Sequence, residues 1–456
     1  MLDINLFREA NGGNPELVRE SQRKRCKSVE EVDRVIAVDR AWVKLRFDVD
    51  ELNKTAKQLQ TQITEKMKGK DKEGADELVK KRQEILKERE GVEAEMNAKE
   101  AELKSLLCNM GNIVHESVVA TDDEAFNPIV RTHFKDGVTP QPLTPEEKAA
   151  KGILPHHQVL FRLDGFDAER GSKVSGHRGY FLKNIGLRLN QALINYGLDF
   201  LREREYDLLQ TPFLMRKEMM AKCAQLDDFD EQLYKVQNQT ADGQDDSRYL
   251  IATSEQPIAS YHADEWFDDP ANQLPKRYAG YSTCFRKEAG ASGKDTWGLF
   301  RIHQFEKVEQ FCITEPEQSW EMFETMIGHS EAFYQSLGLS YRIVEIVGGA
   351  LNNAAAKKYD LEAWFPNYGE YKELVSCSNC TDYQSRRLEI RCGLKKLGER
   401  EKKYVHCLNS TLSATERTLC CLLENYQTPE GLVIPEKLRP YLGGLDFVPY
   451  VRALQN

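Results

Sequence analysis

The first quarter of the chain carries two successive heptad patterns of apolar residues. The second pattern runs from Ile85 to Ile113 and is interrupted by Arg89 and Lys99. Between the patterns, residues 68–76 hold two glycines among charged residues, which predicts an antiparallel helical hairpin with its tip near Gly69–Gly74. Each helix would have roughly 40 residues and a length of about 60 Å. The apolar residues of the first pattern, which alternate spacings of three and four, are Trp42, Leu45, Val49, Leu52, Ala56, Leu59 and Ile63.

Beyond residue 120 the pattern changes. Residues 121–155 contain five prolines and no sustained periodicity, which is typical of a linker or a surface excursion. After this stretch, helical segments at 179–205, 318–337 and 413–427 are mixed with strand-like runs that follow one another directly. This order favours an α+β fold with an antiparallel sheet over a doubly wound parallel one. We therefore predict three regions: a helical arm domain at 1–120, a linker at 121–155 and an α+β domain at 156–456.

Composition narrows the class of protein. The 456 residues are 40% hydrophobic and 30% charged, and the mean hydropathy is −0.60, as in a soluble protein. We find no apolar run of membrane-spanning length, no secretory signal and no Arg-rich transit peptide. The 11 cysteines lack a disulfide spacing, which predicts reduced thiols and a cytoplasmic location, without a membrane partner.

The charge distribution separates the hairpin tip from the rest of the chain. The net charge of −10 argues against indiscriminate nucleic-acid binding, and we expect no DNA partner. The tip nevertheless concentrates Lys66, Lys68, Lys70 and Lys72. A long rod with lysines suits RNA helices, which are bound mainly through shape, phosphates and 2′-hydroxyls. A coiled coil used for dimerisation is the alternative.

Two weaker motifs have plainer explanations. Cys377 and Cys380 have the spacing of half a zinc site, but no second ligand pair stands out, so two thiols at the end of a strand are favoured. Residues 290–294, Gly-Ala-Ser-Gly-Lys, resemble the end of a P-loop. They have two residues instead of four between the glycines, and Asp295 follows the lysine, so a loop between strands is favoured.

The segment 284–311 reads as strand, loop, strand and gathers charged and aromatic side chains. Arg286 and Glu288 lie two residues apart, as do Arg301 and His303, so each pair is expected on one face of its strand. Phe305 lies beyond them, and the alternation extends to Glu309. Arginines that hold phosphates and an aromatic ring that stacks on a base would suit a nucleotide. From spacing alone, a salt-bridged sheet surface is favoured.

The same segment resembles motif 2 of class II aminoacyl-tRNA synthetases, with the core Phe285–Glu288. Residues 413–427, with Arg417, resemble motif 3, and the stretch ending in Pro212 resembles motif 1. TSEQP (253–257), FRIHQFEKVEQF and ELVSCSNCTDYQ are similar to the seryl-tRNA synthetase family of eukaryotic cytosolic type, in which a long coiled-coil arm also grips the tRNA. The resemblance covers essentially the whole chain.

The resemblance implies roles for individual residues. Arg286, Glu288, Arg301 and Arg417 would be catalytic, and Glu373 with Ser376 would hold Mg²⁺. The serine-binding residues would be Thr253, Ser254, Glu255, Arg286, Glu309, Asn409 and Thr411. The ATP-binding residues would be Arg286, Lys287, Glu288, Arg301, Ile302, His303, Gln304, Phe305, Glu373, Leu374, Val375, Ser376 and Arg417.

The resemblance also implies an activity. The family activates L-serine with ATP and Mg²⁺, transfers it to tRNA(Ser) and works as a homodimer; tRNA(Sec) is left open as a second substrate. Two alternatives are a tRNA-binding paralogue without catalysis and a ligase that loads an amino acid onto a carrier protein. The charged residues of the three motifs speak against the first, and the long arm speaks against the second.

Overall fold

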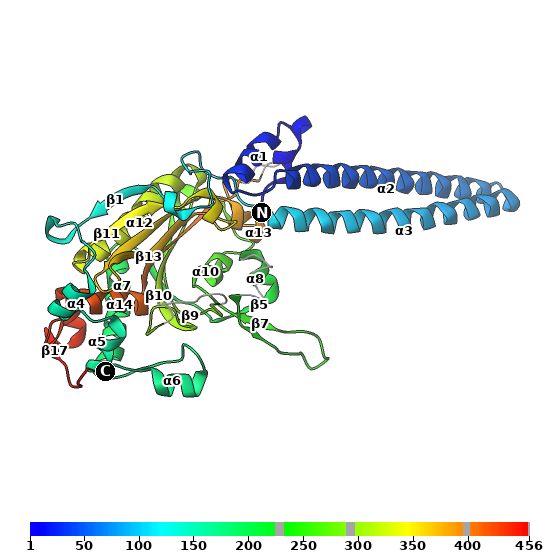
Figure 1. Ribbon diagram of the computed structural model, residues 1–456. Coiled ribbons are helices and arrows are strands. Elements are labelled where there is room, and N and C mark those ends of the chain that lie inside the picture. Colours follow the sequence, from blue (N-terminus) through cyan, green and yellow to red (C-terminus); the bar gives the residue numbers. More distant parts are fainter. Residues whose placement is uncertain (224–231, 289–296, 395–401, 455–456) are drawn as a thin grey trace. The chain divides into compact units, whose positions relative to one another are not determined.

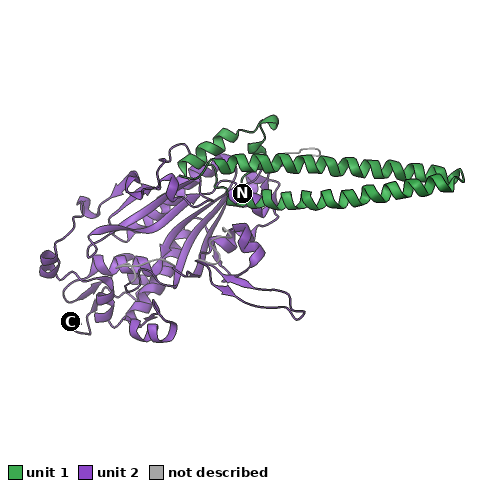
Figure 2. Ribbon diagram, turned by 45° about the vertical axis from the view of Figure 1, so that its right-hand side comes forward, with its two compact units in different colours: residues 1–113 green, residues 114–456 purple. Residues whose placement is uncertain are grey.

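The computed structural model describes residues 1–223, 232–288, 297–394 and 402–454. The chain forms two compact units, residues 1–113 and 114–456, which are coloured separately in Figure 2. Within the described residues, no helix has the length and apolar character needed to span a membrane.

The first unit is a helical hairpin with a small cap. Two 3₁₀ turns, Ile4–Phe7 and Glu9–Asn11, and helix α1 (Pro15–Lys24) precede the long helices α2 (Glu30–Lys68) and α3 (Lys72–Asn109), as Figure 1 shows. Val49, Ala56 and Ile63 of α2 are buried at intervals of seven residues. This spacing is that of a coiled-coil seam satisfied within one chain. The predicted antiparallel hairpin is confirmed.

The tip of the hairpin is tighter than the glycines suggest. Helix α2 ends at Lys68 and α3 begins at Lys72, so Gly74 lies inside a helix. Asp71 explains the early start, because its carboxylate caps α3 by accepting a hydrogen bond from the Gly74 backbone N–H at 3.1 Å. The same carboxylate pairs with Lys66 Nζ at 2.7 Å.

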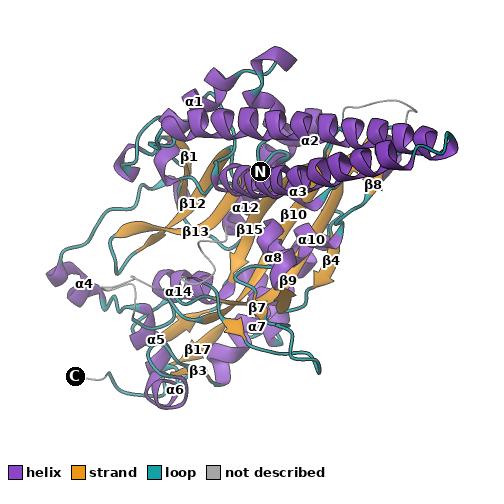
Figure 3. Ribbon diagram, turned by 90° about the vertical axis from the view of Figure 1, so that its right-hand side faces the viewer, coloured by secondary structure: helices purple, strands orange, loops and turns teal. Residues whose placement is uncertain are grey.

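The second unit is built on an eight-stranded sheet, whose strands lie side by side in Figure 3. The strand order is β1-β11-β12-β13-β15-β10-β9-β4, and every pairing is antiparallel except that of β4 with β9. The predicted antiparallel α+β fold is thus confirmed. The strands are β1 (Ile129–His133), β4 (Asp207–Gln210), β9 (Lys276–Phe285), β10 (Gln304–Thr314), β11 (Tyr341–Glu345), β12 (Lys357–Phe365), β13 (Glu370–Asn379) and β15 (His406–Ala414).

Smaller sheets surround the large one. Strands β5 (Leu214–Arg216), β7 (Arg248–Leu250) and β6 (Lys235–Val236) form a three-stranded sheet in that order. The two-stranded pairs are β2 (Phe166–Asp167) with β3 (Phe181–Leu182), β8 (Trp266–Phe267) with β14 (Arg391–Cys392), and β16 (Gly431–Val433) with β17 (Phe447–Pro449).

Helices bury both faces of the sheet. The main core joins it to α7 (Asn184–Arg202), α12 (Ser319–Ser336) and α14 (Thr415–Tyr426). A second core joins it to α10 (Glu255–Tyr261) and α13 (Tyr383–Leu388). On β10, Val308 and Cys312 belong to the first core, and Phe311 and Ile313 belong to the second, as the alternation of a strand requires. Short helices elsewhere are α4 (Pro145–Lys151), α5 (His156–Arg162), α6 (Ala168–Ser175), α8 (Lys217–Cys223) and α11 (Pro270–Gln273).

The segment predicted as a linker is partly built into the second unit. Within residues 121–155, Ile129–His133 forms the edge strand β1 and pairs with β11, and Pro145–Lys151 forms α4. The strand is short, and two of its apolar residues, Ile129 and Val130, stay exposed, so no buried periodicity marks it in the sequence. The boundary between the two units in the chain falls between Ile113 and Val114.

Candidate active site

A cavity of about 320 Å³ opens where β10, β12, β13 and β15 run side by side. Its lining alternates along these strands with side chains of the main core: Lys307 and Glu309 face the cavity, whereas Val308 between them is buried in the core. The structure brings most of the predicted ATP and serine residues into this one lining: Thr253, Glu255, Arg286, Glu288, Arg301, Ile302, Phe305, Glu309, Glu373, Leu374, Ser376, Asn409, Thr411 and Arg417.

A β-bulge on β13 aims part of this lining. Glu373 and Ser376 are three residues apart, so a regular strand would place them on opposite faces. In the pairing with β12, Glu362 lies opposite Glu373 and Leu361 lies opposite Val375, which leaves Leu374 as the extra residue. This bulge turns Glu373 to the side of Ser376.

Strand β15 has the same device. Val308 lies opposite Ser413 and Glu309 lies opposite Thr411, so Leu412 is the extra residue. As a result Thr411 and Ala414, also three residues apart, both reach the cavity. Bulges next to active sites commonly re-aim side chains in this way.

Three arginines define one end of the cavity. Arg286 lies with its Cζ 5.1 Å from the centroid of the Phe305 ring. Arg301 Nη1 donates to Glu288 Oε2 at 3.3 Å. Arg417 Nη1 donates to the Glu373 carbonyl at 3.1 Å and lies 3.7 Å from its carboxylate. Guanidinium groups suit the oxygens of a polyphosphate, and the phenyl ring suits a base.

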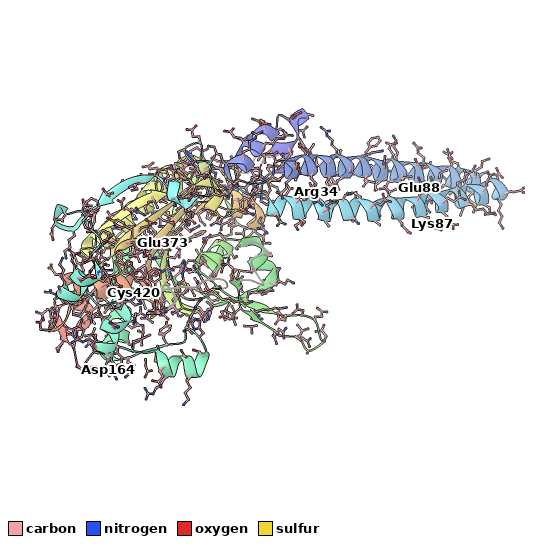
Figure 4. The ribbon with its side chains drawn as sticks, in the orientation of Figure 1. Arg34, Lys87, Glu88, Asp164, Glu373 and Cys420 are labelled. Carbon is pink, nitrogen blue, oxygen red and sulfur yellow. The ribbon has the colours of Figure 1, made fainter. Side chains whose placement is uncertain are left out.

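Glu373 carries a negative charge at the centre of this cluster, and Figure 4 labels it beside the strands. Partial burial alone would raise the pKa of its carboxyl, but Arg417 and Lys358, with the two other arginines, lower it below its ordinary value. An ionised carboxylate is a ligand type that divalent ions such as Mg²⁺ prefer.

The residues around Glu373 fit Mg²⁺. Ser376 supplies a hydroxyl, and Asp360 on the neighbouring strand is buried with its Oδ1 lacking a hydrogen-bond partner among the described residues. These are the hard oxygen donors that Mg²⁺ prefers, and nucleotide sites commonly use one or two protein ligands with phosphates and water. In the described ranges, no three or more His, Cys, Asp or Glu side chains form a cluster that could hold a metal ion. A metal ion at Glu373 would therefore also need oxygen ligands from phosphates and water.

The other end of the cavity is a buried acidic pocket. Glu309 is 2% exposed, pairs with Lys307 and accepts a hydrogen bond from Thr253 Oγ1 at 3.3 Å. Glu255 accepts from Gln384 Nε2 at 2.7 Å. Burial, followed by the neighbouring Glu309, raises the pKa of Glu255. The ammonium group of Lys307 already pairs with the carboxylate of Glu309. Glu255 is therefore the acidic group of the pocket that can pair with an incoming cation, such as an α-ammonium group.

Two lysines of the lining escaped the sequence prediction. Lys307 lies between Phe305 and Glu309 in strand alternation, so the rule that predicted its neighbours could have found it. Lys358 pairs with Asp360 at 3.3 Å and gave no such signal, because it comes from a strand that carried no predicted site residue. The other lining residues that were not predicted are Leu299, Phe300, Asn352, Ser378, Ala414 and Glu416.

Three predicted residues face away from the cavity. Ser254 is fully buried and donates to the Gly280 carbonyl at 3.3 Å. Val375 belongs to the main core, on the opposite side of β13 from Ser376. Lys287 does not line the cavity; its backbone N–H donates to the Gln232 carbonyl at 3.0 Å.

The pairing of Arg301 with His303 on one strand face is wrong. Strand β10 begins only at Gln304, so strand alternation does not apply before it. Arg301 lines the 320 Å³ cavity, whereas His303 and Gln304 line a second cavity of about 500 Å³. The His303 ring instead bonds the Arg286 carbonyl at 2.9 Å. Strand β9 likewise ends at Phe285, before Arg286 and Glu288.

The two weaker motifs have separate outcomes. Cys377 and Cys380 are buried at the end of β13 and form no disulfide, and Asn409 Nδ2 lies 3.6 Å from Cys380 Sγ. The P-loop-like residues 290–294 lie outside the described residues.

Comparisons with known proteins decide the family. Residues 1–114 match the seryl-tRNA synthetase N-terminal domain, and residues 234–426 match the class II tRNA synthetase core domain shared by the G, H, P, S and T enzymes. The cytoplasmic serine–tRNA ligase of Schizosaccharomyces pombe is 58% identical over 100% of this chain and 98% of its own length. The chain belongs to the seryl-tRNA synthetase family.

Further relatives agree with this membership. The cytoplasmic serine–tRNA ligase of Saccharomyces cerevisiae is 57% identical over 100% of this chain and 97% of its own. The solved structure of cytoplasmic serine–tRNA ligase from Naegleria fowleri with AMP has a TM-score of 0.84 at 49% identity, covering 99% of each chain. Seryl-tRNA synthetase from Pyrococcus horikoshii, solved with ATP, has a TM-score of 0.86 at 38% identity, covering 99% of this chain and 100% of its own.

Proposed function

We propose that this member of the seryl-tRNA synthetase family activates L-serine with ATP and transfers the serine to tRNA(Ser). The observation that carries the proposal is the cavity itself, in which an arginine cluster at one end adjoins an acidic pocket at the other. The full-length relatives are named serine–tRNA ligases, and two solved relatives hold AMP or ATP. The roles assigned below to single residues are part of the proposal.

In the first step the serine carboxylate attacks the α-phosphorus of ATP, the bond to pyrophosphate breaks and seryl-adenylate forms. Both reactants are anions, so positive charge must neutralise them and hold attacker and leaving group in line. Arg286, which lies beside Phe305, would contact the carboxylate and the α-phosphate. Arg301 and Arg417 would hold the outer phosphates.

The remaining groups would orient the nucleotide. Phe305 would stack on adenine, and Glu288 would face its amino end. Mg²⁺, when bound, adds positive charge at the phosphates, and Glu373 with Ser376 would hold it. A general base is not required in this step, because the serine carboxylate is ionised at neutral pH.

In the second step a ribose hydroxyl of the terminal adenosine of the tRNA attacks the carbonyl carbon of seryl-adenylate. The bond from this carbon to the phosphate oxygen breaks, so AMP leaves and serine becomes esterified to the tRNA. The hydroxyl proton leaves with the products. The residues proposed to bind the nucleotide would hold AMP in place until this transfer.

Serine would be read by the acidic pocket. Glu255 and Thr253 would bind its ammonium group. Glu309 would accept a hydrogen bond from the side-chain hydroxyl. Asn409 and Thr411 would close the pocket. A buried polar group that is left unpaired by alanine or glycine penalises those amino acids. Threonine would be excluded by its additional methyl group.

The arm would bind the tRNA. Residues 54–89, its distal half, carry eleven Lys and Arg against seven Asp and Glu, whereas residues 30–53 and 90–109 carry six against twelve. Phosphate contacts require this local excess of positive charge on an otherwise acidic protein. Lys68, Lys70 and Lys72 at the tip are exposed, while Lys66 also pairs with Asp71 of the turn. Lys87 and Glu88 mark part of the distal half in Figure 4.

We further propose a homodimer. Strand β4 ends the sheet order, so one of its edges has no neighbouring strand among those described. Leu208 on β4 itself is apolar and 44% exposed. An exposed strand edge with an apolar side chain is commonly covered by a symmetric copy.

The location and the second tRNA complete the proposal. We place the enzyme in the cytoplasm, because the curated relatives described above carry that word in their names. Charging of tRNA(Sec) is proposed as a secondary activity, since an arm that binds RNA through shape and phosphates does not read an anticodon.

Charging of total tRNA with each of the twenty amino acids tests this function. Serine alone should be transferred, and serine alone should support exchange of pyrophosphate into ATP. A protein that binds tRNA but supports no exchange would be the catalytically inactive paralogue. Exchange without transfer to tRNA would favour the carrier-protein ligase.

A further inference from the structure

Two glutamates meet at the nucleotide end of the cavity, where Glu416 is part of the lining. Glu306 follows Phe305 on β10, and Glu416 precedes Arg417 on α14. Glu416 is 1% exposed. Its Oε2 accepts the backbone N–H of Glu306 at 3.0 Å, and its carboxyl lies within hydrogen-bonding reach of the Glu306 carboxyl.

The groups that surround this pair are neutral donors. Asn190 Nδ2 on α7 donates to Glu306 Oε2 at 3.0 Å and lies 3.5 Å from Glu416 Oε1. Tyr180 OH lies 2.9 Å from the Gln304 carbonyl oxygen and 3.3 Å from Glu416 Oε1, and Thr415 Oγ1 lies 3.3 Å from the Glu306 carbonyl oxygen and 3.2 Å from Glu416 Oε2. A direct bond between two carboxyls needs one proton, because two carboxylates can only accept and repel each other.

The titratable neighbours do not supply a balancing charge. Burial, then Glu416 and Glu306, raises the pKa of Tyr180, and burial with the same two carboxyls raises that of Tyr281 on β9. Both phenols therefore stay neutral. The guanidinium of Arg417 is directed to Glu373. Burial, followed by the bond to Glu306, raises the pKa of Glu416 well above its ordinary value.

We propose that Glu416 is a neutral carboxylic acid that donates a hydrogen bond to the Glu306 carboxylate, and that it is thereby a positioning residue for ATP. The bond ties the strand that carries Phe305 to the helix that carries Arg417. Both of these side chains line the cavity, at the ends assigned to adenine and to the outer phosphates. The inference rests on the proposed serine activation and adds a residue that acts through its two neighbours.

The direction of the pH effect follows. When pH rises through the raised pKa of Glu416, a second negative charge appears beside Glu306, and repulsion separates β10 from α14. The distance between Phe305 and Arg417 then changes, so the two side chains no longer fit ATP together and the KM for ATP should rise. The KM for serine should stay constant, because Thr253, Glu255 and Glu309 lie at the other end of the cavity.

The experiment compares the wild-type chain with Glu416→Gln and Glu416→Ala in serine-dependent pyrophosphate exchange. Glutamine keeps a donor to Glu306 but cannot ionise. As pH is raised from neutrality through the pKa of Glu416, the wild-type KM for ATP should rise about tenfold, while that of Glu416→Gln should stay within about twofold. Glu416→Ala should raise the KM for ATP about tenfold at each pH, with the KM for serine within about twofold.

Infrared spectroscopy gives a readout independent of catalysis. The wild-type chain at neutral pH should show the C=O band of a protonated, buried carboxyl, and this band should be missing in Glu416→Gln. An absent band in the wild type, a Glu416→Gln variant as impaired as Glu416→Ala, or identical pH profiles for wild type and Glu416→Gln would overturn the inference. Failure of the proposed function differs, because the wild type would then show no serine-dependent exchange at any pH.

Discussion

At the scale of single residues, the serine pocket works by charge balance. Lys307 and Glu309 form a buried pair, so their charges cancel where solvent cannot screen them. In the proposed roles, Glu255 accepts the ammonium group of the substrate and Arg286 pairs with its carboxylate. These two charges also cancel, so a zwitterionic amino acid, which is itself neutral, can bind without changing the net charge of the pocket.

Replacement of Glu309 by alanine should weaken the rejection of alanine as a substrate. Polar pockets that read a hydroxyl can discriminate by about 10⁴ or more, and most of this factor should disappear with the carboxylate. Pyrophosphate exchange with serine and with alanine measures the ratio of the two kcat/KM values. Glu309→Gln serves as the control, because it keeps an acceptor for the hydroxyl and should retain part of the discrimination.

A Glu309→Ala variant that activates serine normally and still rejects alanine would show that another residue reads the hydroxyl. Lys307 loses its partner in this variant, so circular dichroism and thermal melting must first establish that it folds.

Much of the lining could be predicted through the family resemblance, but not its geometry. The motif residues Arg286, Phe305 and Arg417 were predicted and do line one cavity. The single-residue bulges at Leu374 and Leu412 carry no sequence signal, and without them Glu373 and Ser376 would be expected on opposite faces. The exact start of a strand carries as little sequence signal as a bulge. This explains the error at His303, because β10 starts only at Gln304, the residue after it.

At the scale of elements, a buried histidine joins three segments of the second unit. His156 at the start of α5 has its Nδ1 3.5 Å from Glu424 Oε1 on α14, and its Nε2 bonds the Trp297 carbonyl at 3.3 Å. Burial lowers the pKa of His156, but Cys420 and Glu424 outweigh this and raise it to about 10. Cys420, labelled in Figure 4, marks this part of α14.

This histidine should make stability depend on pH. Because its pKa is raised from 6.5 to about 10, its contribution is complete below about pH 6.5 and is lost as pH rises to about 10. His156→Gln should unfold more easily at neutral pH by about 3 kcal/mol, since Glu424 loses its buried partner. The difference in melting temperature between wild type and variant should shrink towards about pH 10.

The adjacent His157 is a matched control. Burial, followed by the charge of His156, lowers the pKa of His157 to about 4, so this ring is neutral throughout the same pH range. His157→Gln should therefore leave the pH dependence of the melting temperature unchanged. A constant difference between His156→Gln and wild type from about pH 6.5 to about pH 10 would contradict the assigned protonation.

Periodicity in the sequence predicted the long helices correctly. The helices predicted at 179–205, 318–337 and 413–427 appear as α7, α12 and α14 with shorter ends. Short, half-exposed elements such as β1 did not, because five residues at a sheet edge bury too little to leave a pattern.

At the scale of the whole molecule, the assembly should be a dimer through the β4 edge. Sedimentation equilibrium at micromolar concentration should give twice the chain mass of 52.4 kDa. Leu208→Asp should shift the protein to the monomer, since a charge would be buried in the contact. Val138→Asp is the control. Val138 is 69% exposed and follows β1, which lies at the opposite end of the strand order from β4. A monomeric wild type would contradict the proposal.

The central claim is that the second unit activates serine and the arm selects the tRNA. A deletion of residues 54–89 tests it most directly. Asn53 and Arg89 face each other across the hairpin, with Arg89 Nη1 donating to Asn53 Oδ1 at 3.4 Å, so a short glycine turn can join Asn53 to Glu90. The deletion removes the distal excess of positive charge and leaves α1 and the proximal seam in place.

Pyrophosphate exchange and tRNA charging should be measured side by side for this deletion and the wild type. We expect exchange within about threefold of the wild type and charging reduced by about 100-fold or more, chiefly through weaker tRNA binding. Normal charging would show that the tRNA is recognised elsewhere, and an equal loss of exchange and charging would show that the arm instead supports the fold of the catalytic unit.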